Sequence, residues 1–122
     1  MISTVILVHA QPDLVRGRML LRAHVAAQNW RPLDAVRASA AFTALGDLIL
    51  GANLDEVVPV SLAIYNSDRN ASIELGCSLS PSKQDSRLVE KTAQRLRQVA
   101  DAVEIGETAQ HTQIAARLHF QS

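Results

Sequence analysis

The chain has 122 residues, of which 48% are hydrophobic and 20% charged, so it predicts one globular domain and excludes a disordered chain. Twelve basic and twelve acidic side chains leave no net charge, and nothing in the bulk electrostatics favours nucleic acid or an anionic membrane as a partner. The single cysteine excludes an intramolecular disulfide, and the lack of a signal-peptide pattern or of an apolar run of about 18 residues predicts a cytoplasmic protein.

The N-terminal half of the chain predicts one strand followed by two helices. Residues 3–8 form a β-branched run typical of a strand, and Pro12 with Asp13 marks the start of a helix that continues to about residue 29. Residues 33–52 form the longest apolar run of the chain, with only three charges, Asp34, Arg37 and Asp47. A helix that is apolar on most of its circumference is normally buried, so we predict that this second helix lies between other elements.

In the C-terminal half, the apolar pattern changes to the period of strands. Residues 57–65 and 71–79 are strand-like and are separated by a cluster of turn-forming residues, which predicts a β-hairpin. Residues 86–102 have the apolar spacing of a third helix. Two more strands, at residues 103–107 and 112–120, are expected to close the chain.

The order of the predicted elements, β-α-α-β-β-α-β-β, determines the expected fold class. Strand pairs that are neighbours in sequence imply antiparallel pairing. We therefore predict an α+β fold in which residues 1–122 form a single domain. Its architecture is expected to be a two-layer α/β sandwich, with three helices on one face of a mixed, mostly antiparallel five-stranded sheet.

This element order resembles the GHKL ATPase domain, or Bergerat fold, and within it the bacterial anti-sigma factors and switch-protein serine/threonine kinases. Residues 13–30, DLVRGRMLLRAHVAAQNW, look like the first helix of that branch, and Asp34 and Arg37 fall where its second helix opens. Residues 88–107 look like its late helix and following strand. The resemblance implies a nucleotide site for ATP and magnesium and a role in signal transduction and transcription regulation.

The catalytic positions of that family are altered in this chain. The family's second helix carries a glutamate general base and, one turn later, an asparagine that helps to hold magnesium. The corresponding positions here are Ala44 and Leu48, whose side chains can neither take a proton nor coordinate a cation. A shifted register would place Asp47 at the position of the base and would retain one carboxylate.

The nucleotide-binding motifs are altered as well. The family's Asp-x-Gly-x-Gly motif corresponds to residues 78–82, in which the aspartate has become Ser78 and the two glycines have become Ser80 and Ser82. The five glycines of the chain include no two within four positions, so the glycine-rich cradle for the phosphates is missing. By the resemblance, these changes imply a degenerate nucleotide pocket, made of Ala44, Leu48, Ser78, Ser80 and Ser82, that binds neither ATP nor magnesium.

The resemblance, together with the loss of the family's nucleotide site in this chain, predicts a noncatalytic regulatory module. Such a module is a pseudokinase that acts by binding another protein. The arginines of the first helix, Arg16, Arg18 and Arg22, are the candidate partner-binding residues, within a basic N-terminal half that also includes Arg31 and Arg37. The expected partners are a sigma factor, an antagonist, a sensory protein or a second copy of the chain. The sequence does not choose among them.

Two alternatives stay open at this point. The chain could be an active ATP-dependent serine/threonine kinase that uses Asp47 as its catalytic residue, with ATP and magnesium bound at a non-standard site. The former nucleotide cleft could instead bind another small ligand. We expect Cys77 to be a buried structural thiol. The chain has four histidines, and their spacing is not typical of metal ligands: His9, His24, His111 and His119.

Overall fold

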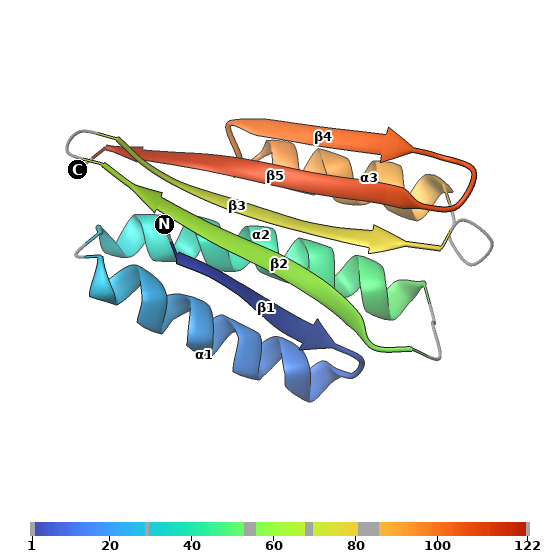
Figure 1. Cartoon of the computed structure of the whole chain (residues 1–122), viewed down its shortest axis with the longest axis horizontal. Helices are drawn as coiled ribbons and strands as arrows, with labels where there is room; N and C mark the ends of the chain where they lie inside the picture. Colours follow the sequence, from blue (N-terminus) through green and yellow to red (C-terminus); the bar gives the residue numbers. More distant parts are fainter. Residues whose placement is uncertain (1, 29, 53–55, 68–69, 81–85, 122) are drawn as a thin grey trace.

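The computed structural model describes residues 2–28, 30–52, 56–67, 70–80 and 86–121. All eight predicted elements are present in the predicted order (Figure 1). They are β1 (Ile2–Val8), α1 (Gln11–Ala27), α2 (Pro32–Gly51), β2 (Val58–Asn66), β3 (Asn70–Leu79), α3 (Ser86–Arg97), β4 (Ala102–Glu107) and β5 (Thr112–Gln121).

The strands form one five-stranded sheet in the order β1-β2-β3-β5-β4. Each of its four strand pairs is antiparallel. The predicted α+β two-layer sandwich is confirmed, and the described sheet is entirely antiparallel rather than mixed. The last strand, β5, lies between β3 and β4, so the C-terminal hairpin joins the sheet through its second strand.

The three helices form a layer on one side of the sheet, with α2 between α1 and α3 (Figure 1). Burial alternates along the strands, as in β2, where Val60, Leu62 and Ile64 are buried while Ser61 and Tyr65 are exposed. One face of the sheet therefore forms the core with the helices, and the other face is open to solvent. The predicted burial of the second helix is confirmed, because half of its residues are buried.

Glycines allow α1 and α2 to pack closely. A Cβ atom added to Gly17 of α1 would overlap the ring of Phe42 on α2, and one added to Gly46 of α2 would overlap Leu14 on α1. Phe42 is fully buried. Each glycine therefore leaves space for a large side chain of the other helix, which lets the two helix backbones approach each other.

An aspartate stabilises the start of each of the first two helices. Asp13 Oδ2 accepts hydrogen bonds from the backbone N–H groups of His9, at 2.8 Å, and Ala10, at 2.9 Å. Hydrogen bonds from Ala10 and then His9 hold the pKa of Asp13 below its usual value. Asp34 Oδ2 accepts the backbone N–H of Arg31 at 3.1 Å. These bonds satisfy backbone donors that a helix start leaves unpaired.

The third helix is shorter than predicted and ends at Arg97 rather than near residue 102. The backbone N–H of Gln98 donates to the carbonyl of Arg95, and that of Ala100 donates to the carbonyl of Leu96, which closes the helix in a turn. The N–H of Asp101 then donates to the carbonyl of Arg117 on β5. Pairing with the sheet therefore competes with the helix at this point and determines where it ends.

Candidate functional site

The residues of the predicted nucleotide pocket do not come together in the structure. Ala44 and Leu48 are each 1% exposed and lie in the core of the helix layer. Ser78 is exposed on the opposite, open face of the sheet, because it alternates with the buried Cys77 and Leu79. Ser80 follows the end of β3 and is half-buried, and Ser82 lies outside the described residues.

Asp47, the carboxylate of the shifted register, lies on the outward side of α2. Arg95 of α3 donates from Nη1 to its Oδ2 at 3.0 Å, and both side chains are about half exposed. In the described part of the chain, no group of three histidine, cysteine, aspartate or glutamate residues could hold a metal ion. The geometry therefore places Asp47 in a solvated ion pair that links α2 to α3.

Cys77 is buried in β3, as the alternation predicts. Burial in apolar surroundings raises the pKa of its thiol from 9.0 to about 12. The thiol is therefore protonated at neutral pH and is a poor nucleophile.

The predicted partner-binding arginines project from the outside of α1. Arg16 forms an ion pair with Asp13, one turn earlier on the same helix. Arg18 is half-buried and its Nη1 donates to Thr43 Oγ1 of α2 at 3.4 Å, so it lies over the groove between the two helices. Arg22 is exposed one turn further along α1. The structure thus places Arg18 next to the outer side of α2, and Arg22 follows it one turn later on α1.

Large apolar side chains are exposed among these arginines. Met19 of α1 is 66% exposed, and Val15, one turn before it, is also exposed. Val36 of α2 is 60% exposed and lies two turns before Thr43, the contact of Arg18. We call this outer side of α1 and α2 the helix surface, defined by Val15, Arg18, Met19, Arg22, Val36 and Thr43.

Charge is divided unequally between the two layers. The three helices contain eight basic and four acidic residues, a net charge of +4. The five strands contain one basic residue, Arg117, and three acidic residues, Glu74, Glu104 and Glu107, a net charge of −2. The neutral chain therefore has a basic helix layer. Ten of the twelve basic residues of the whole chain are arginine, the basic side chain that is enriched at protein interfaces.

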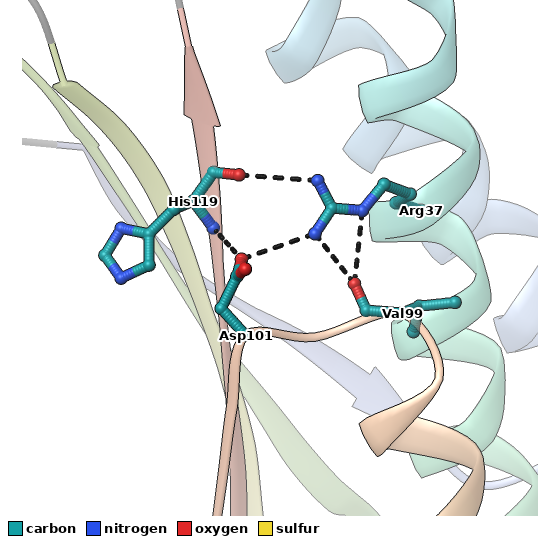
Figure 2. A network of polar contacts seen from close by, with 4 residues as sticks. All are labelled: Arg37, Val99, Asp101 and His119. Atoms are coloured by element: carbon teal, nitrogen blue, oxygen red, sulfur yellow. Dashed lines mark hydrogen bonds and ion pairs between the residues drawn. The ribbon is translucent and has the colours of Figure 1, made fainter.

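Arg37 of α2 forms a polar cluster that sequence reasoning missed (Figure 2). Its Nε and Nη2 donate to the carbonyl oxygen of Val99, at 3.2 and 2.9 Å, and its Nη1 donates to the carbonyl oxygen of His119 at 3.3 Å. Nη2 also pairs with Asp101 Oδ2 at 3.3 Å, and this oxygen accepts the backbone N–H of His119 at 2.6 Å. Arg37 thus joins α2 to the segment before β4 and to β5.

An aromatic pair extends the Arg37 cluster. The Arg37 guanidinium lies 5.3 Å from the centroid of the Phe120 ring. Trp30 packs against the same Phe120 ring, and the two ring centroids are 4.8 Å apart. The guanidinium of Arg37, one of the cations of the basic N-terminal half, is therefore used within the fold. Its partners are 62 to 82 residues away in sequence, so no local pattern indicates them.

No protein-family model matches the chain, and a search of curated proteins finds no match. Among solved structures, the chain is similar to a chain in the crystal structure of the SiaB-SiaC complex from Pseudomonas aeruginosa. The TM-score is 0.62, and the match covers 98% of this chain and 90% of that chain. Sequence identity is 12%, so the likeness shows a shared fold alone.

The resemblance to the GHKL ATPase family is wrong. The chain shares its fold over nearly its whole length with a chain of the SiaB-SiaC complex. The Bergerat-fold and pseudokinase assignments are withdrawn with it. The physical reason is that the resemblance rested on apolar positions and element order. Any helix layer on a sheet of this connectivity shares these features, and the nucleotide motifs did not match. Among the described helices, none is long and apolar enough to cross a membrane.

Proposed function

We propose that this chain is a noncatalytic regulatory module that acts in the cytoplasm by binding a signalling protein through the helix surface. One observation carries the proposal: Met19, Arg22 and Val36 are exposed on the two helices that the contact of Arg18 with Thr43 joins. Exposed apolar side chains rimmed by arginine are typical of protein-binding surfaces. Binding would act by occupying a surface of the partner.

The chemistry of the helix surface specifies the kind of partner. Its cations require an acidic patch, and its apolar centre requires a complementary apolar contact. Among the partners expected from the sequence, a sigma factor, an antagonist or a sensory protein would qualify if it presents such a patch. The fold is consistent with this role, because the similar chain belongs to a structure described as a complex of SiaB with SiaC.

A photo-reactive side chain placed on the helix surface tests the proposed interface. We expect a photo-cross-linking residue at Met19 to give a cross-linked adduct with one protein in extract of the organism that encodes the chain. The matched control carries the same residue at Gln94, which is also exposed on a helix but lies on α3. An adduct formed from Gln94 and not from Met19 would place the interface elsewhere.

We further infer that the protein binds no ATP, because Ala44 and Leu48 lie in the core while Ser78 lies on the opposite face of the sheet. Calorimetric titration of the folded protein with ATP, with and without magnesium, is expected to give no binding heat at millimolar nucleotide. Magnesium-sensitive binding at micromolar ATP would contradict this inference. Loss of phosphate transfer in Asp47→Asn would then identify the chain as a kinase.

A further inference from the structure

The sheet presents an open face that no described element covers (Figure 1). This face is formed by every second residue of the five strands, those that alternate with the buried core positions. Only three of its residues carry a full charge, Glu74, Glu104 and Arg117. A solvent-facing sheet normally carries polar side chains in alternation, and on this face few of the polar side chains are charged.

The charges and the large apolar side chains occupy different halves of the open face. All three charges lie on β3, β4 and β5, where Glu74 forms an ion pair with Arg117. The half formed by β1 and β2 has none and instead exposes Val5, Leu7 and Tyr65. Val5 is 52% exposed although it lies in a regular strand. The open face therefore has an uncharged, largely apolar half.

Small side chains form a shallow groove across the middle of the open face. In the strand register, Ser61 lies opposite Gly76, and Gly76 lies opposite Ala115. The groove has a volume of about 420 Å³ and is bordered by Val5 on β1. A Cβ atom at Gly76 would lie 3.3 Å from the Cβ of Ala115, so the missing side chain leaves the groove floor low. A second protein surface can approach closely there.

We propose that the open face packs against the open face of a second copy of the chain, giving a dimer of two stacked sheets with the helix layers outside. The uncharged half of one copy would lie on the uncharged half of the other. The opposite alignment would place Val5 and Leu7 over Glu104 of the partner, so that an apolar half would face a charged half. This dimer is independent of the proposed helix-surface partner, because the two surfaces lie on opposite sides of the molecule.

The area of the open face favours a second copy over a single bound helix. Five strands spaced about 4.8 Å apart, with about seven residues at roughly 3.3 Å each, span about 24 by 23 Å. Two such faces present about 1,100 Å² in projection, near the lower limit of stable protein interfaces. A helix about 10 Å wide would leave more than half of the face exposed. Aligned sheets, in contrast, cover each other almost completely.

Matched arginine substitutions on the two sides of the molecule test this dimer. Sedimentation of the full chain is expected to give twice the monomer mass at micromolar concentration. Val5→Arg is expected to raise the dimer dissociation constant by at least about 100-fold, because it places like charges between the sheets. Leu33→Arg changes an apolar residue of similar exposure on the helix layer, outside the helix surface, and is expected to leave the dissociation constant within about twofold.

Mixing experiments and a second variant complete the test. An equimolar mixture of Val5→Arg and Val5→Glu is expected to regain the dimer mass, since the uncharged halves face each other. If Val5→Arg is not folded by circular dichroism, Ser61→Arg, in the centre of the groove, takes its place. A wild-type chain that stays monomeric at millimolar concentration would overturn the proposal. So would a dimer that Leu33→Arg dissociates as strongly as Val5→Arg, or one that both variants leave intact.

Discussion

Replacing Phe42 with alanine is expected to lower the free energy of unfolding by about 3–5 kcal/mol, the range for removing a fully buried aromatic side chain. Phe42 is 0% exposed and fills the space above Gly17 at the contact of α1 with α2. Its removal leaves a cavity that the helix backbones cannot close without moving. Denaturant unfolding followed by circular dichroism measures the change, and Leu33→Ala, at an exposed position, is the control with a change below about 0.5 kcal/mol.

A double-mutant cycle with Gly17 tests whether Phe42 is stabilising because it fills the space that Gly17 leaves between α1 and α2. Alone, Gly17→Ala is expected to destabilise the protein by about 1–3 kcal/mol, because the added methyl group overlaps the Phe42 ring. In the Phe42→Ala background the same change is expected to cost less, since the ring that the methyl group overlaps is gone, Ile6 Cγ2 at 3.0 Å is the remaining close neighbour, and alanine favours the helix. Additive effects of the two substitutions would show that these side chains do not share one space.

Replacing Arg37 with methionine is expected to lower the free energy of unfolding by about 2–3 kcal/mol, because two backbone carbonyls lose a charged donor. Methionine retains much of the apolar length of the side chain, so the change in the free energy of unfolding measures the contribution of the guanidinium group. The affected carbonyls belong to Val99 and His119, which connect the α3–β4 segment and β5 to α2. Amide hydrogen exchange in β4 is expected to accelerate more than exchange in β1, which Arg37 does not contact.

The comparison for Arg37 is Arg97→Met on α3. Arg97 is exposed, and its ion pair with Glu90 is long, at 3.7 Å. Exposed pairs of this kind contribute little, so a change below about 0.5 kcal/mol is expected. Equal stabilities of Arg37→Met and Arg97→Met would mean that the cluster of Figure 2 does not hold the C-terminal hairpin to the helix layer.

Local patterns were sufficient to predict the elements and their buried sides. The apolar run at residues 33–52 has few polar positions, and such a helix is stable only when it is covered on several sides, as α2 is. The alternation in residues 71–79 likewise predicted one buried face of β3, which the structure confirms. These features depend on residues close in sequence, for which period and hydrophobicity determine burial.

Features that depend on contacts between residues far apart in the chain could not be predicted from local sequence patterns. The insertion of β5 between β3 and β4 joins Cys77 to Ile114, a pairing that no local motif specifies. The early end of α3 follows from the bond of Asp101 to β5, and the role of Arg37 follows from carbonyls far along the chain. The family assignment was wrong for a related reason. It relied on a pattern that reports element order and does not report how the strands are arranged in the sheet.

The affinity of the cross-linked partner for a charge-reversed helix surface tests the central claim most directly. The double variant Arg18→Glu and Arg22→Glu is to be compared with Lys91→Glu and Arg97→Glu, which makes the same charge change at exposed positions of α3. We predict that the first weakens binding at least about tenfold and reduces its dependence on salt, while the second stays within about twofold. Equal affinities for the two variants would contradict partner binding through the helix surface.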